Sequence, residues 1–282
     1  MNQFGGNWTE AKIEMIVSYA KAYLIIMNKY PQFEILYFDG FAGSGDINED
    51  DKTDLDTIKG AAVRILEIDT PKPFDLYYFV EMNEANAEEL KKTITNTFPD
   101  KKGIHVVRGD CNNKLVSMAE YLKKRPSCRV LAFIDPYGMS VNWSSIEILK
   151  GLGIDLWILV PTGIGVSRLL KRDGNISEAW LNKLEKFLGI SRDEIIERFY
   201  KKVRYQGLFD LEPESLIVKE SNVISRIHNL YKERLQTVFK YVSDAFVLRN
   251  SRNSVMYHFM MASNNTAALK IANDIVKPKF KL

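Results

Sequence analysis

Apolar and polar positions follow two regular patterns along the first 160 residues. Short apolar runs that end at polar residues or glycines are typical of buried strands, and apolar residues every three or four positions are typical of amphipathic helices. The expected strands cover residues 34–39, 76–81, 105–109, 129–135 and 155–160. Helical spacing fills the intervals, at residues 8–28, 60–68, 85–97, 114–124 and 143–149. This alternation predicts a mostly parallel sheet covered by helices, as in Rossmann-like α/β proteins.

The strand pattern stops after residue 160 and returns only near the C-terminus. Helical spacing at residues 179–188, 191–202 and 215–243 predicts a helical insertion over 161–243, which would act as a lid or as a surface for a partner or substrate. Two expected strands at 245–249 and 255–262 have so short a connection that we expect an antiparallel hairpin, followed by a helix at 265–276. The sequence thus predicts a core with an N-terminal helix over 1–160, the insertion, and a segment over 244–282 that completes the core.

Composition narrows the class of protein. The hydrophobic share of 46% and charged share of 27% are ordinary for a globular chain, and no apolar run is long enough to span a bilayer. The N-terminus does not resemble a signal peptide. Two cysteines cannot form a disulfide framework or a four-thiolate zinc site, so we expect a cytoplasmic protein.

Charge is distributed unevenly between the two halves of the chain. Residues 1–160 carry 18 Lys/Arg and 23 Asp/Glu, whereas residues 161–282 carry 21 and 13. Scatter over solvated helices would explain this, and so would a polyanion bound by the C-terminal half. On the second interpretation, Arg168, Lys171 and Arg172 are the expected contacts to a phosphate backbone.

A glycine-rich turn follows the first expected strand, which ends at Asp39. The spacing D-x-F-A-G-x-G places Phe41, Ala42, Gly43 and Gly45 in this turn. A strand, a glycine-rich turn and a helix form the usual cradle for an adenosyl cofactor. The acidic loop that follows would repel the pyrophosphate of a dinucleotide, but acidic groups suit the ammonium and sulfonium of S-adenosylmethionine (SAM). An ordinary strand–turn–helix loop is the alternative.

The next two expected strands also end in acidic residues. Glu81, followed by Met82, could accept hydrogen bonds from both ribose hydroxyls. Asp110 could accept the exocyclic amine of adenine, while Cys111 offers a backbone N–H to the ring. The alternative for Glu81 is a solvated cap at the end of its strand. The alternative for Asp110 is the N-cap of the following helix, which is compatible with adenine binding.

The fourth expected strand brings Asp135, Pro136 and Tyr137 to the same edge of the sheet. Proline stiffens the turn, Asp135 could accept hydrogen bonds from a planar amine, and Tyr137 could stack on a base. A structural turn is the alternative, because Asp-Pro commonly opens turns. The three histidines are scattered, and their spacing indicates no metal site.

Taken together, these motifs resemble those of the three-Cys-motif partner proteins (TcmP). The similar elements are Trp8–Lys12, D-x-F-A-G-x-G, G-D-C-N at Gly109–Asn112, and D-P-Y-G with Trp143 downstream. The resemblance covers most of residues 8–165 and the terminal strand pair, and is weak in the insertion. It implies a SAM-dependent methyltransferase of class I, and a partner protein that bears a three-cysteine motif and resembles radical-SAM proteins.

Other methyltransferases are similar at the fourth strand end. Amino-methyltransferases that act on adenine carry [DN]-P-P-[FYW], but here Tyr137 comes one residue early and the second proline is absent. The tRNA guanine-N2 dimethyltransferases carry D-P-F-G, which is closer to Asp135–Gly138. Both groups act on exocyclic amines of bases. Cytosine-C5 methyltransferases share F-A-G-x-G but need a Pro-Cys nucleophile that this chain lacks.

The sequence therefore predicts methyl transfer from SAM to an amine nitrogen, with a nucleic-acid base as the favoured acceptor. Lys12 is expected to meet the methionine carboxylate, and Asp135 and Tyr137 to face the acceptor. Two alternatives stay open. The chain could be a non-catalytic SAM-binding protein whose insertion docks the three-Cys-motif partner, or it could methylate a protein or small molecule.

Overall fold

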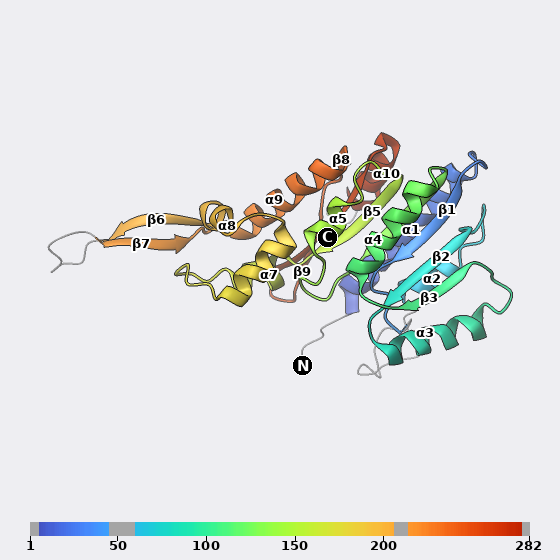
Figure 1. Cartoon of the computed structure of the whole chain (residues 1–282), viewed down its shortest axis with the longest axis horizontal. Helices are drawn as coiled ribbons and strands as arrows, with labels where there is room; N and C mark the ends of the chain where they lie inside the picture. The colour runs from blue at the N-terminus through green and yellow to red at the C-terminus, as the bar shows by residue number, and fades with distance from the viewer. Residues whose placement is uncertain (1–5, 45–59, 206–213, 278–282) are drawn as a thin grey trace.

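A twisted eight-stranded sheet forms the centre of the protein (Figure 1). The computed structural model describes residues 6–44, 60–205 and 214–277. The strand order is β3-β2-β1-β4-β5-β10-β8, and β9 also pairs with β10. The strands are β1 (Glu34–Asp39), β2 (Leu76–Glu81), β3 (Ile104–Arg108), β4 (Cys128–Ile134), β5 (Ile154–Val160), β8 (Tyr241–Val242), β9 (Phe246–Arg249) and β10 (Val255–Ser263).

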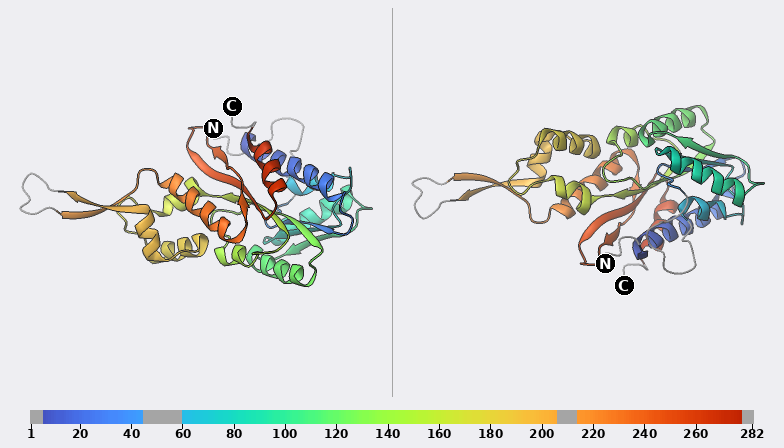
Figure 2. Two further views of the ribbon diagram at one scale, coloured as in Figure 1. Left: turned by 90° about the horizontal axis from the view of Figure 1, so that it is seen from above. Right: turned by 90° about the horizontal axis from the view of Figure 1, so that it is seen from below.

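Helices cover both faces of this sheet, as the two views of Figure 2 show. One face packs against α1 (Gly6–Met27), α2 (Ala61–Leu66), α3 (Glu84–Thr97) and α10 (Thr266–Val276). The other packs against α4 (Cys111–Lys124), α5 (Trp143–Glu147), α7 (Glu178–Leu188), α8 (Arg192–Phe199) and α9 (Val223–Val238). Alternation along β1 explains the two layers, because Tyr37 points to the first face and Phe38 to the second.

The strand pairing confirms the predicted Rossmann-like fold. Strands β1 to β5 are parallel, so their carboxyl ends meet at one edge of the sheet. The order reverses between β1 and β4, and such a switch point is where ligands bind in doubly wound sheets. The expected antiparallel hairpin is β9–β10, and β10 also pairs antiparallel with β5.

The segment between β5 and β8 differs from the prediction in its secondary structure. It contains helices, but also an antiparallel hairpin of β6 (Tyr200–Tyr205) and β7 (Glu214–Lys219) that projects from the body of the protein (Figure 1). The helix predicted over 191–202 was therefore wrong at residues 200–202. The helix predicted over 215–243 was wrong at residues 215–219 and again at strand β8, residues 241–242. Residues such as Val203 and Ile217 are compatible with a helical spacing, but they also favour a strand once a partner strand is present.

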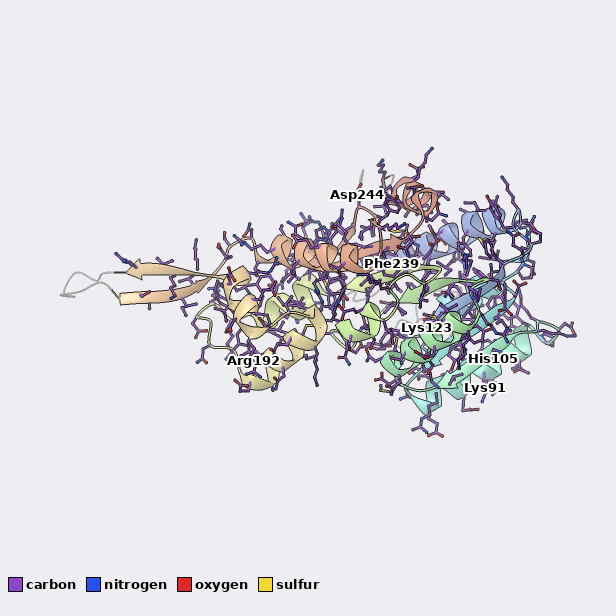
Figure 3. All side chains as sticks on the ribbon, turned by 45° about the horizontal axis from the view of Figure 1, so that its top comes forward. Lys91, His105, Lys123, Arg192, Phe239 and Asp244 are labelled. Carbon is purple, nitrogen blue, oxygen red and sulfur yellow. The ribbon has the colours of Figure 1, made fainter. Side chains whose placement is uncertain are left out.

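Long-range hydrogen bonds hold the base of this hairpin and its neighbouring helices. The Lys219 backbone N–H donates to the Arg172 carbonyl at 2.9 Å, and the Tyr200 hydroxyl donates to the Lys171 carbonyl at 2.8 Å. Arg192, labelled in Figure 3, begins α8 and pairs with Glu185 of α7 at 2.9 Å. The hairpin and its helices therefore join the segment that leaves β5.

Two short helices directly after β5 were also absent from the prediction. A π-helix covers Thr162–Val166 and α6 covers Ser167–Leu169. Within the described part of the chain, no helix has the length and hydropathy needed to cross a membrane.

Candidate functional site

The turn after β1 is held by backbone hydrogen bonds to its own strand end and to β2. Asp39 is buried, and its Oδ1 accepts from the Phe41 N–H at 3.1 Å. Ala42 donates its N–H to the Val80 carbonyl at 2.9 Å. Gly43 has φ +65°, a conformation that glycine adopts without strain. Gly45 lies outside the described residues.

Gly40, which the sequence analysis missed, brings three elements into close contact. A Cβ atom added at Gly40 would lie 2.6 Å from Sγ of Cys111 and 2.7 Å from Cδ1 of Ile134. Any side chain here would therefore require the Cys111 and Ile134 side chains to move. In the sequence, only its position next to Asp39 indicated that Gly40 belongs to the site.

Glu81 lies at the end of β2, where its carboxylate is buried beside the glycine turn. Its Oε2 accepts from the Gly43 N–H at 2.9 Å, and its Oε1 accepts from the Asn83 N–H at 2.7 Å. Two backbone donors therefore orient the carboxylate. Each oxygen has a second lone pair with which it can accept a hydrogen bond from a ligand hydroxyl.

Asp110 serves as the N-cap of α4, which was one of the two expectations for it. Its Oδ1 accepts from the N–H groups of Asn112 at 2.7 Å and Asn113 at 3.3 Å. Both bonds use Oδ1, so Oδ2 can accept a ligand donor. The N–H of Cys111 has no partner within the helix because Cys111 is its first residue.

The Cys111 thiol belongs to the core. Its side chain is buried, and burial, with the nearby charges of Asp39 and Asp110, raises the pKa of the thiol well above its usual value. The thiolate form that a nucleophile requires is thereby disfavoured. The backbone of Cys111, and not its sulfur, is the group that a ligand can use.

These elements surround a pocket of about 140 Å³ at the carboxyl edge of the sheet. The exposed side chains of Met82 and Tyr137 lie at this pocket. It is lined by Gly40, Phe41, Glu81, Met82, Gly109, Asp110, Cys111, Asn112, Tyr137 and Ser140. The structure thus brings predicted residues from the first four strand ends into one site.

Asn112 is a second residue whose role the sequence analysis missed. Its Nδ2 donates to the Ser140 carbonyl at 2.9 Å, and its Oδ1 accepts from the Asn142 N–H at 2.7 Å. The side chain therefore ties the start of α4 to the loop that follows β4. Asn112 stood inside the G-D-C-N motif, but only the fold revealed what it contacts.

Asp135 follows β4 directly and forms an ion pair with Lys12 of α1. The Lys12 side chain is almost completely buried, and Asp135 is about a quarter exposed. Pro136 is buried beside it. Lys12, which was expected to meet the methionine carboxylate of SAM, is therefore paired with Asp135, which was expected to face the acceptor.

Three carboxylates and one lysine give this region its electrostatic character. Burial, together with the charges of Asp135 and Glu81, raises the pKa of Asp39 to about 7, although the Phe41 N–H and Lys12 oppose the shift. The acidic groups outnumber Lys12, so a cationic ligand would be favoured here. Among the described residues, no group of three or more metal-binding side chains was found.

Comparisons with known proteins concern the fold alone. No family model matches the chain, and no curated sequence matches it. A solved structure from Legionella pneumophila, assigned to DUF519, is similar at 16% identity and a TM-score of 0.45, over 93% of this chain and 99% of that chain.

Two further similar structures are a complex of Trm1 with SAM and an rRNA methylase. Trm1 from Pyrococcus horikoshii, solved with SAM, has 11% identity and a TM-score of 0.38 over 91% of this chain and 63% of that chain. An rRNA methylase from Streptococcus thermophilus has 12% identity and a TM-score of 0.30 over 67% and 87%. Because a fold does not determine an activity, function must be argued from the residues of this chain.

Proposed function

We propose that the protein is a SAM-dependent methyltransferase that methylates an exocyclic amine of a nucleic-acid base. The observation that carries this proposal is the pocket at the carboxyl edge of the sheet. It combines the glycine turn, the oriented carboxylate of Glu81 and the start of α4 at Asp110 and Cys111.

The hydrogen-bonding groups of these residues match those of SAM. Glu81 would accept hydrogen bonds from the ribose hydroxyls, and Oδ2 of Asp110 would accept one from the adenine amine. The Cys111 N–H would donate a hydrogen bond to the adenine ring. The excess of carboxylates near Asp39 favours the ammonium and sulfonium groups. When bound, SAM supplies an electrophilic methyl group.

The residues after β4 would handle the acceptor. Asp135 would accept hydrogen bonds from the amine as its nitrogen becomes tetrahedral, and Lys12 would hold the carboxylate in position. Tyr137, which is 80% exposed, is free to stack on a base. Asn112 would fix the loop that presents these groups.

Basic residues after β5 support a nucleic-acid substrate. Arg168, Lys171 and Arg172 are all exposed. We infer that these three cations would contact the phosphates of the substrate.

Cofactor binding and methyl transfer test the proposal directly. We expect calorimetry to show binding of SAM and S-adenosylhomocysteine but not of NAD. Tritium from labelled SAM should enter a pool of cellular RNA or DNA. Binding of SAM without transfer to either pool would contradict the substrate and favour a partner-docking protein. Binding of NAD in place of SAM would contradict the whole proposal.

Asp39 should make cofactor affinity depend on pH. Affinity for SAM should rise as pH increases through about 7, because ionised Asp39 attracts the cationic ligand better than the neutral acid does. In the absence of ligand, the free energy of unfolding has the opposite pH dependence. Between about pH 4 and 7, Asp39 is protonated in the folded state and ionised in the unfolded state, so stability falls as pH rises over this range.

Calorimetry over this pH range measures the effect on binding, and Asp39→Asn is the matched control because it has no titrating group. If the wild type and this variant show the same pH dependence of SAM affinity, Asp39 does not face the cofactor.

A further inference from the structure

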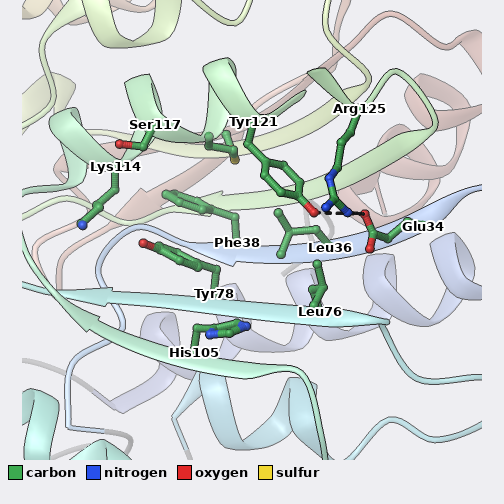
Figure 4. Close-up of a pocket in the computed structure, with 11 residues that line it drawn as sticks. Glu34, Leu36, Phe38, Leu76, Tyr78, His105, Lys114, Ser117, Tyr121 and Arg125 are labelled. Atoms are coloured by element: carbon green, nitrogen blue, oxygen red, sulfur yellow. Dashed lines mark hydrogen bonds and ion pairs between the residues drawn. The ribbon is translucent and has the colours of Figure 1, made fainter. Parts of the chain in front are cut away.

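A second cavity shares no lining residue with the proposed cofactor pocket. It has a volume of about 490 Å³ and sits between α4 and strands β1 to β3 (Figure 4). This volume is within the range of small-molecule sites. The cavity is lined by Glu34, Leu36, Phe38, Leu76, Tyr78, His105, Lys114, Ser117, Met118, Tyr121 and Arg125.

The floor of the cavity is a row of aromatic rings on three adjacent strands. Phe38 stacks on Tyr78 with ring centroids 5.8 Å apart and planes 6° apart, and Tyr78 lies 6.2 Å from the ring of His105. Phe38 is buried, Tyr78 is half-buried and His105 is exposed. The aromatic row therefore runs from the core at Phe38 to the surface at His105, and a ligand with rings can pack against its exposed side.

The two ends of the cavity differ in charge. At one end, the Tyr121 hydroxyl donates to Oε2 of Glu34 at 3.1 Å, and Arg125 lies 3.5 Å from the same oxygen, so these charges compensate each other. At the other end is Lys114, towards which the hydroxyl of Tyr78 also points (Figure 4). Within the described residues, no ion pair was found for Lys114, although it is only partly exposed.

We propose that this cavity binds a small molecule with a flat ring system and one anionic group. The rings would pack against the exposed side of the aromatic row at Tyr78 and His105. The carboxylate, sulfonate or phosphate would meet the Lys114 ammonium and the Tyr78 hydroxyl. The apolar walls favour the ring system, and the uncompensated lysine decides the sign of the charge. This site is separate from the methyl-transfer function and does not depend on it.

A matched pair of fluorescent probes tests the proposal. 1-Anilinonaphthalene-8-sulfonate carries flat rings and one anion, and N-phenyl-1-naphthylamine has the same rings without the anion. Titrations are made on the full chain with and without saturating S-adenosylhomocysteine, so that any probe bound in the proposed cofactor pocket is recognised by its displacement. Lys114→Met should weaken binding of the sulfonate about tenfold, the effect of one charge-assisted hydrogen bond, and should leave the neutral probe unchanged.

Two further variants keep the result interpretable. Lys123→Met removes an exposed cation from the same helix, one that pairs with Glu120 outside the cavity, and should change neither probe. Ser117→Trp places a large ring at an exposed lining position and should block both probes.

Equal sulfonate affinity in the wild type and Lys114→Met would overturn the proposal, as would unchanged binding in Ser117→Trp. Sedimentation gives an independent check. A wild-type dimer that becomes monomeric in Ser117→Trp would mean that a second copy of the chain covers the cavity, and this too would overturn the small-molecule site.

Discussion

Replacing Asp135 with alanine should lower methyl-transfer turnover by about 10²–10³, by analogy with the loss of an oxyanion-hole donor. The lone pair of an aryl amine is delocalised into its ring, so the nitrogen must become tetrahedral before it attacks a methyl group. An acceptor placed for that bent geometry stabilises the transition state more than the flat ground state. Asp135 lies at the end of β4, next to the strand that carries the glycine turn, which suits this role.

The ion pair between Asp135 and Lys12 determines the controls. Asp135→Ala leaves the buried ammonium of Lys12 without this partner, which can destabilise the fold by itself. Asp135→Asn keeps an acceptor oxygen and should retain partial activity. Thermal unfolding of both variants separates lost stability from lost catalysis. If a folded alanine variant turns over like the wild type on a confirmed substrate, Asp135 is only a turn residue and the amine mechanism fails.

Replacing Glu81 with alanine should weaken SAM binding by roughly 1.5–3 kcal/mol, the usual size of a charge-assisted hydrogen bond. Two losses contribute to this result. The ribose hydroxyls lose their acceptor, and the N–H groups of Gly43 and Asn83 lose the carboxylate that holds the glycine turn. Calorimetry with SAM measures the change.

Two variants show whether the effect belongs to this carboxylate. Glu81→Gln keeps one acceptor oxygen and should give an intermediate affinity. Glu84→Ala removes a nearby exposed carboxylate that pairs with Arg108 outside the pocket, and should leave SAM affinity unchanged. Unchanged affinity in Glu81→Ala would show that the ribose contact is assigned to the wrong residue.

Local pattern predicted most of the sheet because its strands are short, continuous apolar runs that end at polar residues. The expected bounds of β1 and β2 match the structure at both ends, at Asp39 and Glu81. The hairpin β6–β7 was not predicted, because its residues suit a helix or a strand and only pairing between the two segments decides. Helix α8 ends at Phe199, and no proline or glycine at that point marks the change.

By itself, the sequence determined the alternation of strands and helices that favours a parallel sheet, the order of the acidic strand ends and the glycine turn, because each of these is set by residues close together in the chain. Only the tertiary structure decided which side chains from distant parts of the chain meet at the sheet. Lys12 and Asp135 are 123 positions apart, and their contact depends on how α1 lies on the sheet. The close approach of Gly40 to Cys111 and the cavity beside Tyr78 likewise depend on where α4 crosses the strands. No local pattern in the sequence encodes this position of α4.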